Sequence, residues 1–383
     1  MSIYFIVILA YLLLLAGMSV YKSFQVKDQS DTMVAGRKLP AWMLVGTLLC
    51  TWIGSGSIIA GAGLAYMVGF SEIWMSAGAW AAIILVYFLA GPARSLAQFT
   101  VQVFLEKRYG KWARILGTLT VITAYLTIVG YQFKAGGMIL ELVADVPREY
   151  GIPLTAIFVI VITSFAGMLS VVTADIFNGI IIILGIVISV PLMLLNLGGI
   201  GNLTASLPAD RFTVFGQNDF FWALGVFFPT FFLLLGESNM YQKFFSARDE
   251  KAARNSVIGW VVGTIVIETL ICALAVIGSA LFPDLKDKET VILHSARHGL
   301  PLWAGCLLLS ASVAIIVSTA NSFLLTPSIN ITRDIYQRFI VQDASQKKII
   351  LFQRGATVVF GLLAFLLLTQ FKTVLDMAFT DYP

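Results

Sequence analysis

The run Thr51-Trp52-Ile53-Gly54-Ser55-Gly56-Ser57 lies in the middle of an apolar stretch, residues 41–66, that is long enough to cross a membrane. Glycine lowers the cost of leaving the helical conformation, so Gly54 and Gly56 favour an unwound turn here. Non-helical backbone inside a bilayer has to be buried in protein or line a cavity, where its free carbonyl groups can face an ion. Close packing of helices through small residues is the alternative explanation of this pattern.

The composition of the chain places this run in a membrane rather than in a soluble core. Charged residues make up 12% of the 383 residues and hydrophobic residues 58%, whereas soluble domains contain about 25% charged residues. This composition excludes intrinsic disorder, a collagen-like repeat and a secreted disulfide-rich scaffold. All three cysteines lie in apolar runs, so no disulfide framework is expected. The chain is therefore predicted to be an all-α polytopic membrane protein.

Ten stretches reach the roughly 20 mostly apolar residues that a transmembrane helix needs. They are residues 3–21, 41–66, 73–93, 113–139, 153–171, 175–198, 219–241, 255–282, 301–329 and 349–371. Because no soluble segment separates them, residues 1–383 are expected to form a single transmembrane domain.

Basic residues are concentrated in alternate loops. Eighteen of the 25 Lys and Arg residues follow the first, third, seventh and ninth stretches. Loops rich in Lys and Arg stay in the cytoplasm. The N-terminus is therefore predicted to lie outside a plasma (inner) membrane, with the basic loops on the cytoplasmic side.

A second polar interruption occurs in the seventh stretch, which contains Pro229-Thr230 and Gly236-Glu237-Ser238-Asn239. Proline removes a backbone donor, and an acid inside a membrane usually marks a pathway. The alternative is a proline kink with Glu237 at the cytoplasmic interface, where it would pair with Lys243.

The ninth stretch contains the run Ser318-Thr319-Ala320-Asn321-Ser322, with four polar residues among five. Its hydroxyl groups could supply neutral oxygen ligands to a monovalent cation. The alternative is that each hydroxyl bonds the carbonyl four residues earlier in its own helix.

The two interrupted stretches are five spans apart. Secondary transporters place broken helices at corresponding positions of two inverted repeats, with solute and ion between them. An odd number of spans inverts the second repeat, so we expect a first repeat over residues 41–198 and a second over 219–383. The stretch 3–21 is then an extra N-terminal helix.

Short motifs in a specific order and spacing resemble the sodium:solute symporter family, which includes carriers of proline, pantothenate, sugars and sialic acid. They are MVAGRKLP at 33–40, the run 51–57 with Ser71-Glu72 after it, FLEKRYG at 104–110, GMLSVVTAD at 167–175, QKFFSARDEK at 242–251, and Ser318-Thr319 followed by TRDIY at 332–336. The resemblance implies the five-plus-five inverted-repeat fold of the leucine transporter. It also implies sodium-coupled symport of a small polar organic solute, such as an amino acid, carboxylate or vitamin, by alternating access. Since the family continues past residue 383, the last helix of the second repeat is expected to be missing.

The family's sodium site can be carried onto this sequence residue by residue. The resemblance places backbone carbonyl ligands at Thr51, Gly54 and Ile315, and hydroxyl ligands at Ser318 and Thr319. No metal other than sodium and no organic cofactor is implied.

Some family members hold a second sodium ion with a hydroxyl at the position of Ile315 and an acid that matches Asp175. Ile315 has no hydroxyl, so a single sodium ion is expected. Asp175 is then assigned to the inner ion path, or else caps the start of the sixth stretch.

The same resemblance places solute contacts at Ile58, Glu72 and Thr230. Glu72 has a second interpretation as an acid at an extracellular helix N-terminus, where it would stabilise the helix dipole. Ile58 and Leu234 stand where sugar carriers have polar groups, which argues against a sugar.

Other functions stay open at this point. Glu268 and Lys134 could titrate in a proton-coupled carrier, and a truncated carrier could serve as a non-transporting sensor or scaffold. An enzyme is not expected, because His294 and His298 lack a third metal ligand. The expected partners are a small polar solute, sodium and the lipid bilayer, with no nucleic acid and no inferred oligomeric state.

Overall fold

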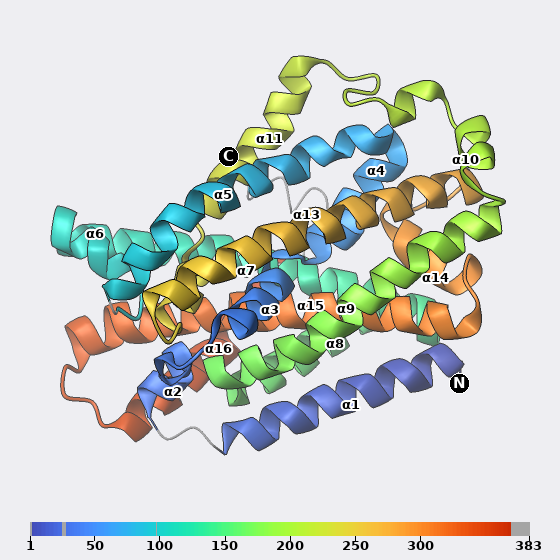
Figure 1. The fold of residues 1–383 in the computed structure, drawn as a ribbon. Coiled ribbons are helices and arrows are strands. Elements are labelled where there is room, and N and C mark those ends of the chain that lie inside the picture. Colours follow the sequence, from blue (N-terminus) through green and yellow to red (C-terminus); the bar gives the residue numbers. More distant parts are fainter. Residues whose placement is uncertain (1, 25–27, 97, 369–383) are drawn as a thin grey trace.

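The computed structural model describes residues 2–24, 28–96 and 98–368, which form a long bundle of helices (Figure 1). The helices are α1 (Ile3–Ser23), α2 (Gln29–Val34), α3 (Ala41–Trp52), α4 (Ala62–Val68), α5 (Ile73–Ser95), α6 (Gln102–Tyr109), α7 (Lys111–Ala144), α8 (Arg148–Phe165), α9 (Met168–Leu197), α10 (Ile200–Ser206), α11 (Phe220–Leu235), α12 (Ser238–Phe245), α13 (Glu250–Leu281), α14 (Val291–His298), α15 (Leu302–Asn330) and α16 (Gln346–Leu367). In Figure 1 the N-terminus, α10 and α14 lie at one end of the bundle, and α2 and α6 lie at the other.

Within the described residues, nine helical segments are long and apolar enough to cross a membrane, against ten predicted stretches. The difference arises at the second stretch, where α3 contains only 12 residues and stops at Trp52. The boundary between the fifth and sixth stretches also differs, because the chain leaves the helix at Ala166 and Gly167 rather than beside Asp175. The expectation that the last repeat helix is missing concerns residues 369–383, which lie outside the described residues.

Two helices are interrupted at corresponding places. Helix α3 ends before Ile53, which has φ −72° and ψ 101°. Helix α11 ends at Leu235, and Glu237 has nearly the same extended conformation, with φ −73° and ψ 106°. A π-helical turn from Gly56 and then α4 continue the first span, and α12 continues the second. Two breaks with similar backbone conformation, five spans apart, are consistent with the inverted repeat, whose bounds stay a prediction.

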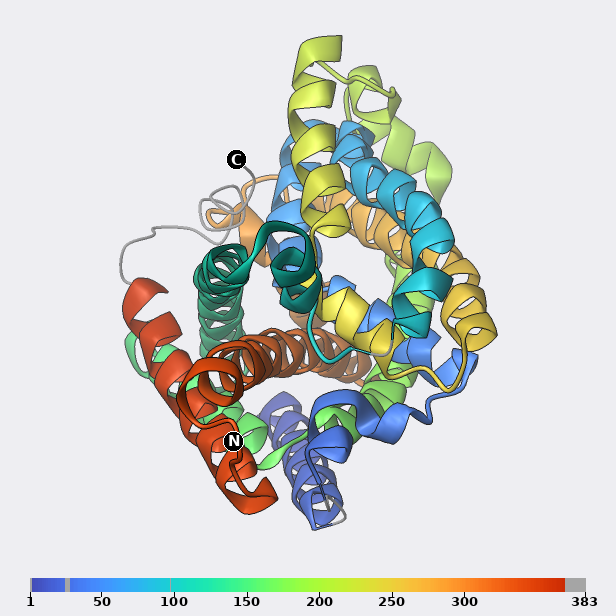
Figure 2. The ribbon, with the colours of Figure 1, turned by 90° about the vertical axis from the view of Figure 1, so that its left-hand side faces the viewer.

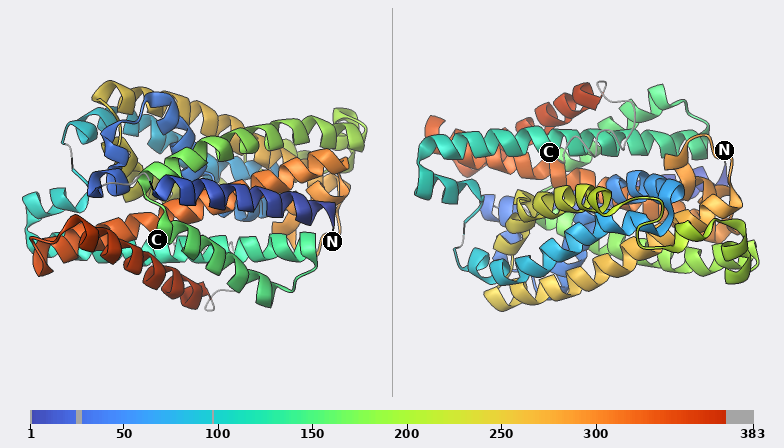
Figure 3. Two further views of the ribbon diagram at one scale, coloured as in Figure 1. Left: turned by 90° about the horizontal axis from the view of Figure 1, so that it is seen from below. Right: turned by 90° about the horizontal axis from the view of Figure 1, so that it is seen from above.

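Helix α15 lies in the core of the bundle, as the view from one end of the bundle shows (Figure 2). It packs against α9 and α7, and buried residues run along almost its entire length. The view from below shows α1 lying along one side of this core (Figure 3, left), where it contacts α15 and α9. The polar residues of α15 are therefore held inside protein and away from lipid.

A separate layer of α5, α11 and α13 lies beside the two breaks. Helices α5 and α11 approach each other closely at Gly78, where an added Cβ would lie 2.1 Å from the Phe227 carbonyl oxygen. Only glycine allows so close an approach of the two helices.

Candidate functional site

The break after α3 removes the usual helical partners of two carbonyl groups. In a continuous helix the N–H of Ser55 would donate to the Thr51 carbonyl. It donates instead to Gln132 Oε1 of α7, at 3.1 Å. The N–H of Ser57 likewise bonds a different carbonyl from that of Ile53. The Thr51 and Ile53 oxygens are thus available to another donor or to a cation.

Thr319 of α15 faces these carbonyl groups. Its Oγ1 lies 3.2 Å from the Cys50 oxygen, 3.4 Å from the Thr51 oxygen and 3.1 Å from the Ile53 oxygen. A hydroxyl has a single hydrogen to donate, so it can satisfy only one of three acceptors. The remaining lone pairs and the Thr319 oxygen form a buried group of neutral oxygens, which we call the carbonyl cluster.

The structure brings together only some of the ligands expected for sodium. Thr51 and Thr319 lie in the carbonyl cluster. The Gly54 carbonyl does not, because it accepts two backbone N–H groups of the turn that restarts the helix, at 3.1 and 3.2 Å. Ile53 takes its place in the cluster. Ile315 lies one turn earlier on α15, with its side chain fully buried in the core.

Ser318 belongs to a second buried cluster, centred on Asp175 of α9. Ser318 Oγ donates to Asp175 Oδ1, and Thr47 Oγ1 donates to Asp175 Oδ2 at 2.5 Å. Asp175 is 1% exposed and lies two turns inside α9, which begins at Met168. It therefore does not cap the start of this helix.

Lys243 of α12 supplies the positive charge of this second cluster. Its Nζ lies 3.9 Å from Asp175 Oδ2 and donates to the carbonyl and the hydroxyl of Thr47, each at 2.9 Å. It also donates to Thr51 Oγ1, and lies 3.3 Å from Ser322 Oγ. Because Thr51 belongs to both clusters, a fully buried ammonium group of the protein sits directly beside the carbonyl cluster.

The sequence pattern placed Lys243 in a cytoplasmic loop, paired with Glu237 in one interpretation. The structure shows that Lys243 is buried and contacts Asp175, while Glu237 faces a cavity. The available signal was Phe244-Phe245, two aromatic residues that follow the lysine and are themselves fully buried.

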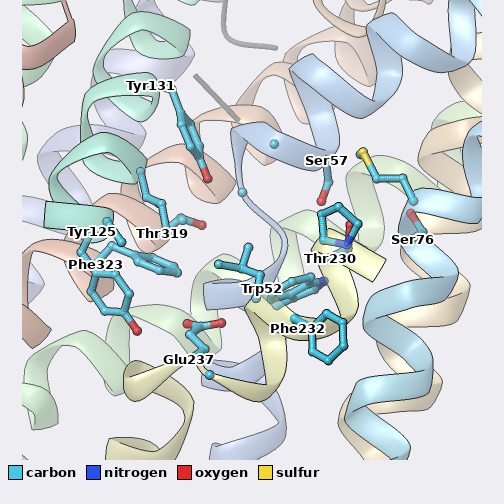
Figure 4. A pocket seen from close by; sticks show the side chains of 18 of the residues that line it. Trp52, Ser57, Ser76, Tyr125, Tyr131, Thr230, Phe232, Glu237, Thr319 and Phe323 are labelled. Atoms are coloured by element: carbon cyan, nitrogen blue, oxygen red, sulfur yellow. The ribbon is translucent and has the colours of Figure 1, made fainter. Parts of the chain in front are cut away.

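A cavity of about 450 Å³ lies between the two helix breaks and adjoins the carbonyl cluster (Figure 4). Gly54 and Gly56 line it from the first break, and Gly236 lines it from the second. Thr319 lines it as well. An ion in the carbonyl cluster and a solute in the cavity would therefore be neighbours.

The cavity wall combines aromatic side chains with two carboxylates. Glu268 of α13 accepts hydrogen bonds from the indole N–H groups of Trp52 at 3.0 Å and Trp80 at 2.7 Å. Glu237 at the second break is 4% exposed, and its Oε1 accepts no hydrogen bond from any described residue. The aromatic lining residues are Trp52, Tyr125, Tyr131, Phe232 and Phe323. The sequence analysis singled out Glu268 as a residue that could titrate, and Trp52 and Glu237 as members of the two interrupted runs.

The three expected solute contacts have different positions. Thr230 lines the cavity, although its hydroxyl donates to the Val226 carbonyl at 3.1 Å. Ile58 is fully buried outside the lining, because adjacent helical residues point in different directions and Ser57 takes the cavity side. Glu72 is buried outside the lining too, with Ser76 and Cys272 near its carboxyl group.

The two histidines lie away from both clusters, on α14. Their ring centroids are 4.4 Å apart. Burial and the nearby positive charge of Arg297 lower the pKa of His298. In the part of the chain that the structure describes, no group of three or more His, Cys, Asp or Glu side chains is placed to hold a metal ion.

Comparison with known proteins finds relatives that are symporters. A sodium/pantothenate symporter of Escherichia coli (strain K12) is 28% identical over 393 residues, which cover 95% of this chain and 78% of the relative. A sodium/proline symporter of Staphylococcus aureus (strain JH9) is 25% identical over 392 residues, covering 94% of this chain and 74% of the relative. These relatives are transporters and not enzymes.

Solved structures confirm the predicted leucine-transporter-like fold. A Na+-coupled sialic acid symporter in a substrate-bound outward-open state superposes with a TM-score of 0.87 at 18% identity, over 96% of this chain and 81% of the other. A nucleobase–cation symport-1 family transporter gives 0.67 at 14% identity, over 92% and 77%. The family profile of sodium:solute symporters matches residues 33–379. The chain therefore belongs to the sodium:solute symporter family.

Proposed function

We propose that this protein is a sodium-coupled secondary active symporter that imports a small polar organic solute by alternating access. In this proposal it resides in the plasma (inner) membrane, with its N-terminus outside and the basic loops in the cytoplasm. The single observation that carries it is the position of Thr319. This residue faces three carbonyl oxygens at a helix break and also lines the adjoining cavity.

The coupling follows from this shared residue. Sodium bound in the carbonyl cluster would hold α3 and α15 together, because its ligands come from both helices. A solute in the cavity would contact the same two helices and the second break, because residues of all three line it. Each ligand therefore stabilises the arrangement that the other requires, which is the reciprocal linkage that symport needs.

The test is binding of radioactive sodium to the purified full chain, together with sodium-driven solute uptake into proteoliposomes. Thr319→Ala removes a hydroxyl ligand, and Ser312→Ala is the matched control. Ser312 lies two turns earlier on the same helix, and its hydroxyl bonds only the Leu308 carbonyl at 2.9 Å. We expect Thr319→Ala to lose sodium binding and Ser312→Ala to retain it. Equal sodium binding by both variants would refute the site.

The same experiment separates the alternatives. Uptake driven by a proton gradient, with no response to sodium, would favour a proton-coupled carrier. Glu268 and Glu237 in the cavity wall are the groups that such a carrier would use. Absence of uptake under either gradient would favour a sensor or scaffold.

A further inference from the structure

The charge of the cavity wall carries information about the solute. Glu237 and Glu268 both line the cavity, and no Lys, Arg or His is among the lining residues that the structure describes. The two acids are the side chains of this wall that can carry a charge near neutral pH, and a cationic solute would stabilise their ionised form, whereas an anion would be repelled by it.

The two acids differ in how many of their carboxylate oxygens accept hydrogen bonds from the protein. Both oxygens of Glu268 are bonded, because Trp52 and Ser57 donate to Oε1 and Trp80 donates to Oε2. Glu237 is 96% buried, yet its Oε1 accepts no hydrogen bond from the described residues. Burying a carboxylate without a partner costs free energy, so Glu237, rather than Glu268, is the acid that would gain from an interaction with a ligand.

The cation nearest in chain position acts on Glu237 through its charge, but it forms no ion pair with Glu237 among the described residues. Lys243 follows Glu237 by only six residues, but its ammonium group is held by Thr47, Thr51 and Ser322 in the cluster around Asp175. Lys243 does not line the cavity. Glu237 itself lines the cavity, so its carboxyl group borders the space that a solute would enter.

Aromatic rings surround this carboxylate. Figure 4 shows Glu237 between Trp52 and Phe232 on one side and Tyr125 and Phe323 on the other. Aromatic faces attract organic cations, and the attraction is strongest for tryptophan in a site without water. A carboxylate within a group of aromatic rings is the arrangement that binds an ammonium group, whether the nitrogen carries hydrogens or methyl groups.

We propose that the solute is an organic cation, an amine or a quaternary ammonium compound, whose charged nitrogen lies between Glu237 and these aromatic rings. This inference rests on the proposed function, because it names the solute class of the same cavity. The cavity volume of about 450 Å³ suits a small solute of this kind.

The test is calorimetric binding of choline, tetramethylammonium and putrescine to the purified full chain, with and without sodium. Proline, pantothenate and glucose serve as the zwitterionic, anionic and neutral probes. Glu237→Gln keeps the shape of the side chain and removes its charge, and Glu237→Asp keeps the charge. Glu149→Gln makes the same change of charge at an exposed residue outside the cavity.

We expect one or more of the organic cations to bind, and Glu237→Gln to weaken that binding by about 10- to 100-fold. For putrescine the cause is the loss of a hydrogen bond to a charged group. Choline and tetramethylammonium have no N–H group, so for them the cause is the loss of the opposite charge beside the nitrogen. Glu237→Asp should lose less and Glu149→Gln nothing. The inference is overturned if only proline, pantothenate or glucose binds. It is also overturned if Glu237→Gln binds radioactive sodium normally, which shows that it is folded, and binds the cation as tightly as the unchanged protein.

The failure of this inference differs from the failure of the proposed function. Sodium binding that depends on Thr319, without binding of any organic cation, would leave symport intact and refute the solute class. Binding of an organic cation that depends on Glu237 but not on sodium would support the solute class and contradict sodium coupling.

Discussion

Replacing Lys243 by methionine tests the internal ion pair beside the carbonyl cluster. The substitution removes the ammonium group and leaves Asp175 buried with only the hydroxyl groups of Ser318 and Thr47 as donors. Removal of one partner from a buried pair costs about 3–5 kcal/mol, because the other charge remains without compensation. Two hydroxyl donors remain, so we expect the lower end, about 3 kcal/mol.

The double variant gives the sharper result. Asp175→Asn alone leaves the buried ammonium without its counter-ion and should also cost about 3 kcal/mol. With both charges removed, neither group is left unpaired, so the double variant should lie within about 2 kcal/mol of the unchanged protein. Denaturant titration of the full chain in mixed micelles, followed by tryptophan fluorescence, measures all three. Additive effects of the two substitutions would refute the ion pair.

Sodium adds a second readout to the same variants. Without Lys243, Asp175 and the hydroxyl groups of Thr47, Ser318 and Ser322 could accept a free cation in place of the ammonium. Sodium should then stabilise Lys243→Met more than it stabilises the unchanged protein, by about 2.7 kcal/mol at 100 times the dissociation constant. Potassium chloride at equal ionic strength is the control. This would also account for the expected single sodium ion, with Lys243 rather than the lack of a hydroxyl at Ile315 as the reason.

Three further predictions concern single residues. Thr319→Ser keeps the hydroxyl and should bind radioactive sodium nearly normally, whereas Thr319→Ala should lose about 10-fold or more in affinity; equal loss would show that the methyl group matters instead. Gly54→Ala places a Cβ 3.0 Å from Thr319 Cγ2 and should reduce sodium binding, while Gly46→Ala in the same span, with nothing within 4 Å of its Cβ, should not. Burial would raise the pKa of Glu106, but its hydrogen bonds and opposite charges with Arg338 and Arg114 have the larger effect. They hold this pKa below its ordinary value of 4.5. The stability from Glu106 is therefore present above pH 4.5 and lost as the pH falls through the lower, folded-state pKa, so acid titration of the melting temperature should flatten in Glu106→Gln.

The elements with a local physical cause could be predicted from the sequence. The low charge content requires a membrane environment, and the bilayer requires helices. The glycines at 54 and 56 and the pair Gly236-Glu237 mark both breaks, because they change the backbone where they stand. The interpretation of Asp175 as a cap at the start of the sixth stretch was wrong, because the sequence does not distinguish an acid at a helix end from an acid buried inside a helix. Its assignment to the inner ion path stays a prediction.

Only the tertiary structure decided which atoms meet. In the carbonyl cluster, the Ile53 carbonyl takes the place expected for that of Gly54. The Gly54 oxygen instead accepts the N–H groups of Ser57 and Ile58, where the helix begins again. Lys243 enters the core, and Glu237 turns toward the cavity, because α12 packs against α3 and α15 after the break. Membership of a helix follows from residues near in the chain, but the rotation and depth of that helix follow from packing against others far away in the sequence. For this reason the sequence determined the presence of two broken helices and an oxygen-rich core, and the packing determined the ligands.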